Sequence, residues 1–178
     1  MGREAAPRRH VVLVGLPGSG KTTVGRLVAA ALGAPFVDLD EAVERRAGKS
    51  VARIFAEAGE RAFRALEAEL GAAALAGPPV VIAPGGGYLT DAVTLRAARR
   101  SGLLVYLETG AAVAAARLEG GAGRPLLAGD ASPARLAALL AVREPLYRGA
   151  ECVVPTGGRS PADVAAAVAS LARSRAGW

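Results

Sequence analysis

Short runs of β-branched and aliphatic residues alternate along the chain with longer segments in which apolar residues recur at helical spacing. The apolar runs predict five buried strands, over residues 10–14, 35–39, 80–83, 103–107 and 151–154. Helical spacing predicts helices over residues 22–32, 40–47, 50–58, 60–76, 91–101 and 111–118, and two more that begin at Ser132-Pro133 and Ser160-Pro161. This alternation favours an α/β fold, a three-layer sandwich around a five-stranded parallel sheet that binds ligands at the carboxyl ends of its strands.

The pattern indicates one domain over residues 1–178. Residues 119–130 hold five glycines and little periodicity, which predicts a lid loop, and we expect residues 1–9 and 173–178 to be flexible. Prolines and glycines interrupt the longest uncharged stretch, residues 70–90, which excludes a membrane-spanning helix there. The amino-terminal segment has no apolar core of a signal peptide. We therefore expect a cytoplasmic protein without a membrane partner.

The charge balance raises the question of a polyanionic partner. The 178 residues include 22 basic and 16 acidic side chains, for a net charge of +6. The arginines are scattered, and three Phe, three Tyr and one Trp leave few rings on which bases could stack. A nucleic-acid partner is therefore disfavoured, and a small polyanionic ligand would account for the positive charge. One cysteine and one histidine exclude an intramolecular disulfide and a Cys/His metal cluster. Cys152 lies on a predicted strand and is expected in the core.

The segment Gly15–Thr22 reads GLPGSGKT and matches the phosphate-binding pattern G-x-x-x-x-G-K-[ST] between a predicted strand and a predicted helix. Glycines let backbone N–H groups turn toward phosphates, and the helix N-terminus adds positive potential. Lys21 would reach the outer phosphates, and Thr22 would ligate magnesium. The sequence therefore predicts nucleoside triphosphate binding.

Two absent residue types narrow the class of nucleotide protein. The chain contains no asparagine, so it cannot carry the Asn-Lys-x-Asp motif by which GTPases read guanine. It also contains no glutamine, which often positions the attacking water of P-loop hydrolases. Hydrolysis is thereby disfavoured but not excluded, since a glutamate can do the same work.

Acidic and glycine-rich segments follow the second and third predicted strands. Asp38 could hold a magnesium shell while Asp40 binds or deprotonates an acceptor hydroxyl, although Asp40 could instead cap a helix. The glycines at 85–87 would let backbone N–H groups approach a ligand closely, or form a plain turn.

Arginines supply further candidate chemistry. Arg64 and Glu67 stand three apart on a predicted helix and can pair, and Arg143 precedes the sequence EPLY. Each arginine, taken alone, fits a solvated surface position. Arg124 in the glycine-rich loop could close over a transferring phosphate, and a flexible loop without that role is an equal alternative.

Taken together and in order, these motifs resemble the shikimate kinase family of bacterial P-loop type, within the nucleoside monophosphate kinase-like fold. The resemblance covers about residues 11–171 and rests on GLPGSGKTT, FVDLDEAVE, GKSVARIF, GERAFRALE, GGG, GRPLL, REPLY and RSP. It implies transfer of the ATP γ-phosphate to the 3-hydroxyl of shikimate, on the route to the aromatic amino acids, by a monomer that uses Mg²⁺.

The resemblance also implies roles for individual residues. Those implied for the acceptor are Asp40 at its hydroxyls as a possible base, Arg64 and Arg143 on its carboxylate, Gly86 and Gly87 at its hydroxyls, and Glu67 orienting Arg64. Those implied for ATP are Gly18, Ser19, Gly20, Lys21, Thr22, Thr23, Arg117, the lid residue Arg124, Arg159 and Pro161. Those implied for magnesium are Thr22 directly and Asp38 through water.

Two alternatives stay open from the residues themselves. Another small P-loop kinase, such as one for gluconate, would also need anion-binding arginines. A basic nucleic-acid-binding NTPase would share the phosphate loop and the positive charge. Two departures from the family pattern, Pro84 before the glycines and a short glycine-heavy lid, bear on lid dynamics more than on chemistry.

Overall fold

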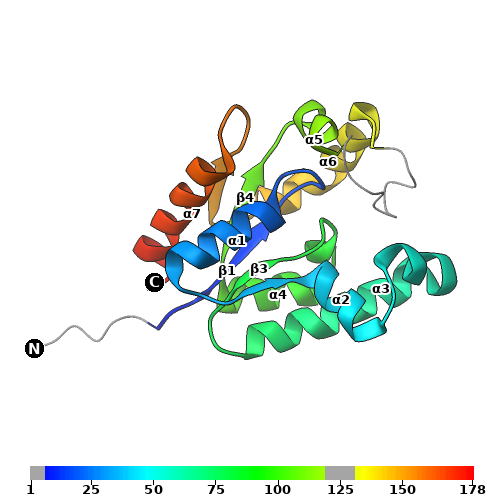
Figure 1. Ribbon diagram of the computed structural model, residues 1–178, viewed down its shortest axis with the longest axis horizontal. Coiled ribbons are helices and arrows are strands. Elements are labelled where there is room, and N and C mark those ends of the chain that lie inside the picture. Colours follow the sequence, from blue (N-terminus) through cyan, green and yellow to red (C-terminus); the bar gives the residue numbers. More distant parts are fainter. Residues whose placement is uncertain (1–6, 119–130) are drawn as a thin grey trace, which may run out of the picture.

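The architecture is a parallel sheet covered by helices on both faces (Figure 1). The computed structural model describes residues 7–118 and 131–178. Its strands pair in parallel, as the sequence predicts, and their order in the sheet is β2-β3-β1-β4-β5. Their bounds are β1 His10–Val14, β2 Phe36–Asp38, β3 Val81–Ala83, β4 Gly102–Glu108 and β5 Cys152–Pro155.

The helices follow the predicted pattern with small changes at their ends. Their bounds are α1 Lys21–Leu32, α2 Leu39–Ala47, α3 Val51–Ala76, α4 Ala92–Ser101, α5 Ala111–Leu118, α6 Pro133–Tyr147 and α7 Pro161–Arg175. Gly59 has a non-helical φ of 77° inside α3, so this helix is kinked where the sequence predicts two helices. A short 3₁₀ helix, η1 (Tyr88–Thr90), was not predicted. None of the helices that the structure describes is long and apolar enough to cross a membrane.

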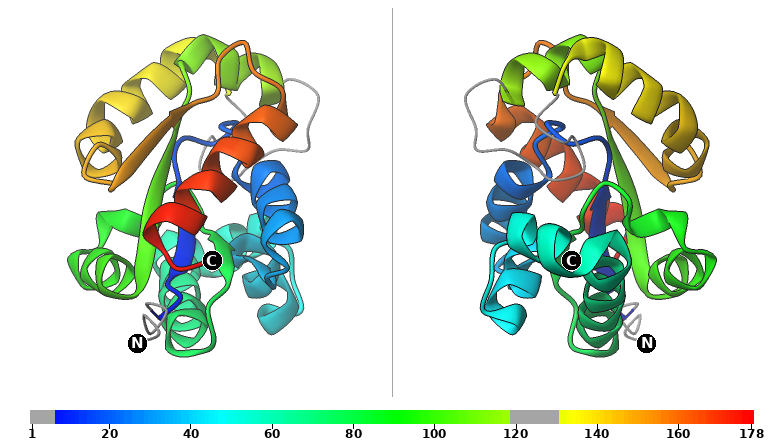
Figure 2. Two further views of the ribbon diagram at one scale, coloured as in Figure 1. Left: turned by 90° about the vertical axis from the view of Figure 1, so that its left-hand side faces the viewer. Right: turned by 90° about the vertical axis from the view of Figure 1, so that its right-hand side faces the viewer.

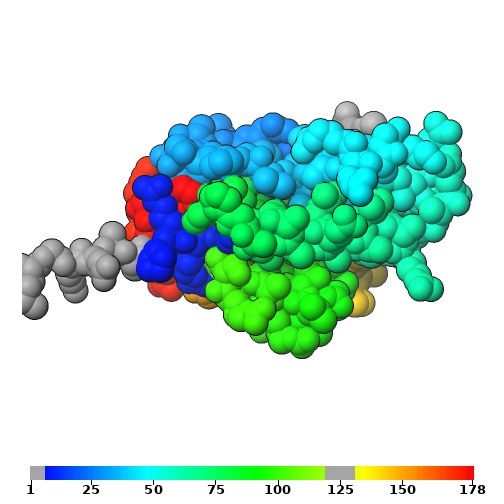
Figure 3. Space-filling model, turned by 90° about the horizontal axis from the view of Figure 1, so that it is seen from below, coloured from blue at the N-terminus to red at the C-terminus, as the bar shows by residue number. Residues whose placement is uncertain are grey.

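Two apolar clusters, one on each face of the sheet, fix the layers. Val11 and Leu13 of β1 pack with α1 and α7, while Val12 and Val14 point to the other face and pack with helices that include α4 and α6. Figure 2 shows α1 and α7 side by side on their face, and Figure 3 shows the molecule from below, with α2, α3 and α4 at its surface. The fully buried β1 is central, so the loop after it lies between the two halves of the sheet.

The two chain ends contact each other where the structure describes them. That residues 1–9 and 173–178 are flexible stays a prediction, and residues 1–6 lie outside the described part of the chain. Helix α7 continues to Arg175, and the Trp178 indole N–H donates to the Arg9 carbonyl over 2.9 Å. The Arg9 guanidinium pairs with Glu151 at 2.6 Å, and Arg8 lies 5.2 Å from the centre of the Trp178 ring. These contacts join residues far apart in the sequence, so no local pattern predicts them.

The only histidine gives stability a defined pH dependence. His10 is buried, its Nδ1 accepts a hydrogen bond from the Val80 N–H over 3.2 Å, and burial lowers its pKa, against a backbone hydrogen bond to Leu75. The unfolded chain therefore binds a proton more readily than the folded one as the pH falls below about 6.5.

We expect the free energy of unfolding to be highest above about pH 6.5 and to decline as the pH falls from there toward about 5, before most carboxylates titrate. Chemical denaturation over this range measures the decline, and one histidine signal in an NMR titration reports the pKa directly. A pKa at or above about 6.5 in the folded protein would contradict this account.

Candidate active site

The phosphate loop, residues 15–22, lies at the carboxyl end of β1 and leads into α1. Gly18 has a φ of 79°, and a Cβ there would lie 2.5 Å from the Ala114 carbonyl oxygen, so only glycine fits. No side chain caps the start of α1 at Gly20, and its first turn carries no acidic residue. The N-terminus of this helix therefore presents backbone N–H groups and positive potential to an anion.

Two side chains of the loop also indicate anion binding. Lys21 is buried, and its Nζ donates to the Gly15 and Leu16 carbonyl oxygens at 2.9 Å each, which holds the ammonium inside the loop. The Ser19 hydroxyl is buried and has no hydrogen-bond partner among the described residues. A buried polar group without a partner is costly unless a ligand or water completes its bonds.

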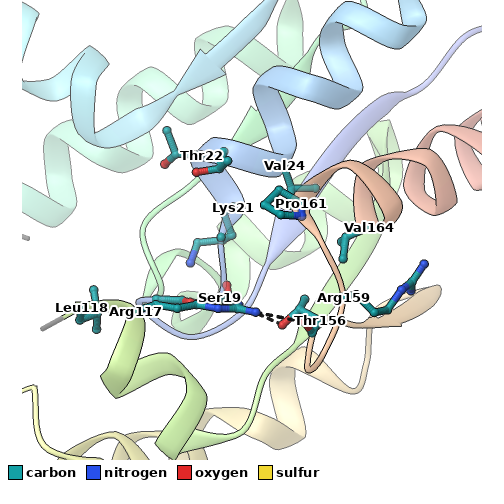
Figure 4. Close-up of a pocket in the computed structure, with 13 residues that line it drawn as sticks. Ser19, Lys21, Thr22, Val24, Arg117, Leu118, Thr156, Arg159, Pro161 and Val164 are labelled. Atoms are coloured by element: carbon teal, nitrogen blue, oxygen red, sulfur yellow. Dashed lines mark hydrogen bonds between the residues drawn. The ribbon is translucent and has the colours of Figure 1, made fainter. Parts of the chain in front are cut away.

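A cavity of about 460 Å³ adjoins the loop (Figure 4). Its volume suits a nucleotide-sized ligand. Its walls bring together nine of the ten residues expected to bind ATP; Arg124 lies outside the described residues. The lining consists of Gly18, Ser19, Gly20, Lys21, Thr22, Thr23, Val24, Arg117, Leu118, Thr156, Arg159, Pro161 and Val164.

Thr156, which the sequence analysis missed, orients an arginine on the cavity wall. The guanidinium of Arg117 donates to the Thr156 hydroxyl over 3.2 Å and to its carbonyl over 3.0 Å (Figure 4). The Thr156 hydroxyl in turn lies 2.6 Å from that of Thr109, and both threonines are buried. A single threonine after a strand carries no motif, so nothing in the sequence marked it.

The arrangement of the carboxylates at the end of β2 differs from the interpretation in which Asp40 caps a helix. Asp38, not Asp40, caps α2: its Oδ1 accepts the Asp40 N–H over 3.0 Å and the Glu41 N–H over 3.3 Å. Its Oδ2 accepts the Thr22 hydroxyl over 2.6 Å. The helix-cap alternative for Asp40 was therefore wrong, because α2 begins at Leu39, before Asp40.

This pair of oxygen donors bears on the expected magnesium ion. The described residues contain no group of three His, Cys, Asp or Glu side chains that could hold a metal alone. Mg²⁺ with a nucleotide needs no such group, since one or two protein oxygens, waters and phosphates complete its octahedron. Thr22 and Asp38, joined beside the phosphate loop, fit that requirement.

Two arginines converge on the glycines that follow β3. A Cβ on Gly87 would lie 2.6 Å from Nη2 of Arg64 and 3.2 Å from Nη2 of Arg143, although the two arginines come from α3 and α6. Arg143 is buried, and its Nη1 has no hydrogen-bond partner among the described residues. Each arginine, taken alone, fitted a solvated surface, whereas the structure brings the two guanidinium groups together, an arrangement that can bind an anion.

Glu67 fixes Arg64 in this group. Its carboxylate is 1% exposed, pairs with the Arg64 guanidinium and accepts the Gly85 N–H over 2.9 Å. Burial raises the pKa of Glu67, and the charge of Arg64 opposes that shift. The carboxylate of Asp40 also faces this turn, since a Cβ on Gly85 would lie 3.2 Å from Asp40 Oδ1.

Gly87 is needed here for space and not for an unusual backbone conformation. Its φ of −98° is open to any residue, yet a Cβ would meet the end of the Arg64 side chain. We expect Gly87→Ala to fold normally, to displace Arg64 and to raise the KM of the acceptor by about tenfold or more.

Gly110→Ala is the matched control for that variant, because a Cβ at Gly110 would meet nothing within 4 Å. Steady-state kinetics with each substrate varied in turn would measure the effect. Equal acceptor KM values for the two variants would contradict the proposed crowding at Gly87.

A phosphate loop on a central strand, with an anion-binding group and carboxylates beside it, defines a small P-loop kinase. Comparison with known proteins makes this class specific. The family model described as shikimate kinase matches residues 17–172. The chain belongs to the shikimate kinase family, and it is an ATP-dependent kinase.

Individual relatives agree with this assignment. The chain is similar to a shikimate kinase from Thermobifida fusca, with 48% identity over 163 residues, which cover 91% of this chain and 94% of the relative. A solved shikimate kinase from Acinetobacter baumannii, in complex with shikimate, has a TM-score of 0.89 and 34% identity over 94% of each chain. A gluconokinase from Sinorhizobium meliloti, with a TM-score of 0.61 and 20% identity, covers 96% of this chain and 95% of its own and shares the fold alone.

Proposed function

We propose that the chain transfers the γ-phosphoryl group of ATP to the 3-hydroxyl of shikimate, giving shikimate 3-phosphate and ADP. The observation that carries this proposal is the meeting of Arg64 and Arg143 at Gly87, beside the phosphate loop. Two fixed guanidinium groups match a planar carboxylate, and the unsubstituted backbone leaves room for a hydroxylated ring. The similar shikimate kinase from Acinetobacter baumannii, which is in complex with shikimate, supports the same acceptor.

The nucleotide binds, in this proposal, along the cavity beside α1. Backbone N–H groups of residues 18–23 surround the phosphates, and Lys21 moves from the loop carbonyls to the outer phosphates. Arg117, Arg159 and Pro161 also line the cavity and would contact the adenine and ribose. Binding both substrates at adjoining sites brings the acceptor hydroxyl into line with the γ-phosphorus, which lowers the entropic barrier to transfer.

The carboxylates serve the transferring group. Thr22 would bind Mg²⁺ directly and Asp38 would bind it through a water molecule. The ion would neutralise charge on the β- and γ-phosphates. Asp40 accepts a hydrogen bond from the acceptor hydroxyl and either takes its proton or only orients it. Arg124, outside the described residues, stays the predicted lid arginine that stabilises charge on the moving phosphoryl group.

ADP release from Mg-ATP tests the proposal against its alternatives. Purified protein is assayed in one buffer with shikimate, gluconate, single-stranded RNA or no acceptor. The proposal predicts ADP release that depends on shikimate. Release with gluconate would favour a sugar-acid kinase, and release with RNA or without acceptor would favour an NTPase.

Three further expectations belong to the same proposal. We expect one kinase domain over residues 1–178, a monomer in solution and a cytoplasmic enzyme that needs no nucleic acid. Light scattering of the purified protein at several concentrations tests the monomer, which a mass of two chains would contradict.

A further inference from the structure

The glycines after β3 form a turn, and glycine permits more than one backbone conformation of such a turn. The Tyr88 N–H donates to the Gly85 carbonyl over 3.0 Å, which closes a four-residue turn with Gly86 and Gly87 at its centre. Gly87, the third residue, has φ −98° and ψ 3°, close to the values of a type I turn. None of residues 85–87 has a positive φ.

Glycine in the third position is the residue type that favours the other common form of this turn. In a type II turn the third residue has φ of about +80°, which is nearly strain-free only for glycine. The two forms differ by rotation of the central peptide by roughly half a turn. Glycine at position 87 leaves space for Arg64. Because glycine also tolerates the type II form, the residue itself does not prevent the central peptide from flipping.

Tyr147 opposes that flip. Its hydroxyl donates to the Gly86 carbonyl oxygen over 2.6 Å, a strong O–H···O geometry, across 61 positions of sequence. The Tyr147 ring is 2% exposed and packs against Tyr106 with ring centres 5.3 Å apart, so the donor has little freedom to move. Burial raises the pKa of Tyr147, with Arg143 opposing, which keeps the phenol protonated as a donor.

The direction of the Gly86 carbonyl decides what the next residue presents. A trans peptide is planar, so the Gly87 N–H points opposite to the Gly86 carbonyl that Tyr147 holds. No described residue accepts this N–H, which leaves it for a ligand. A flipped peptide would present a carbonyl oxygen where this N–H now points, and that oxygen would repel another acceptor.

We propose that Tyr147 is a positioning residue for the acceptor, because its hydroxyl locks the Gly86–Gly87 peptide in the type I form and so holds the Gly87 N–H toward a substrate hydroxyl. Arg143 precedes Tyr147 by one helical turn on the same face of α6. The C-terminal end of α6 thus positions both the Arg143 guanidinium and the glycine turn that this guanidinium contacts. This inference rests on the proposed function for the identity of the acceptor.

Tyr147→Phe tests the proposal because it removes the hydroxyl and leaves the ring. The variant is expected to raise the shikimate KM about tenfold, with kcat and the ATP KM changed less than about threefold. Tyr106→Phe, in the same ring pair, is the matched control and is expected to keep the wild-type shikimate KM. A merely structural loss would affect both substrates together.

An NMR measurement on the unmodified protein gives a second test that does not depend on the variant. Glycine-selective ¹⁵N labelling is expected to give one set of amide signals for Gly86 and Gly87 in wild type, and exchange-broadened or doubled signals in Tyr147→Phe. Doubled signals in wild type, or a Tyr147→Phe variant that matches Tyr106→Phe in shikimate KM, would overturn the lock. Failure of the proposed function would appear separately, as wild-type protein without shikimate-dependent ADP release.

Discussion

Replacing Lys21 with alanine is expected to lower kcat by at least about 10³-fold, because charge developing on the transferring phosphoryl group loses its fixed cation. Lys21 is 6% exposed and already held in the phosphate loop by two carbonyl oxygens, so little reorganisation separates it from the outer phosphates. The same contacts are local to the loop, and the fold should survive their loss. Steady-state ADP release and a thermal melt measure the two effects.

Lys49→Ala supplies the control for Lys21→Ala. Lys49 is the other lysine of the chain, is exposed, and pairs with Glu57 on the surface at 2.5 Å. Exposed pairs contribute about 0–1 kcal/mol, so this variant should keep wild-type turnover. Substantial turnover by Lys21→Ala would remove the phosphate loop from the account of catalysis.

Arg64→Ala is expected to raise the shikimate KM on the order of 100-fold while changing the ATP KM little, because a buried charge-assisted pair with the acceptor carboxylate is lost. The effect should be selective, since Arg64 lies on α3 at the glycine turn and does not line the cavity assigned to ATP. It should also leave the buried Glu67 without its cation, which favours the protonated form of that carboxyl.

Arg61→Ala, an exposed arginine one turn away on the same helix, is the matched control and should resemble wild type. Kinetics with each substrate varied at saturating partner separates the two KM values. Equal losses for shikimate and ATP in Arg64→Ala would contradict the carboxylate assignment.

Most features that could be predicted from the sequence depend on residues that are close together along the chain. The phosphate loop was predicted by residues 15–22 alone, because its glycines, its lysine and its helix start stand next to one another. The strands and helices followed from periodicity for the same reason. Helix ends were predicted less accurately. The N-cap of α2 is Asp38 and not Asp40, a difference of two residues that changes which carboxylate accepts the N–H groups at the helix start.

The anion site and its supports depended on long-range packing. Arg64 and Arg143 were paired only by resemblance to a family, since no local pattern says that α3 and α6 meet at Gly87. Thr156 and Tyr147 were missed as functional residues because each acts through a backbone or side-chain contact with a distant part of the chain. The contacts of Trp178 with Arg8 and Arg9 were also not predicted, because these residues lie at the other end of the sequence.

The position of the phosphate on the product tests the central claim most directly. Wild-type protein is incubated with Mg-ATP and shikimate, and the phosphorylated product is examined by ³¹P–¹H correlation NMR. The account predicts one new phosphate ester whose phosphorus couples to the proton on carbon 3 of the shikimate ring. Phosphate on another oxygen, or inorganic phosphate as the only new phosphorus signal besides ADP, would contradict it.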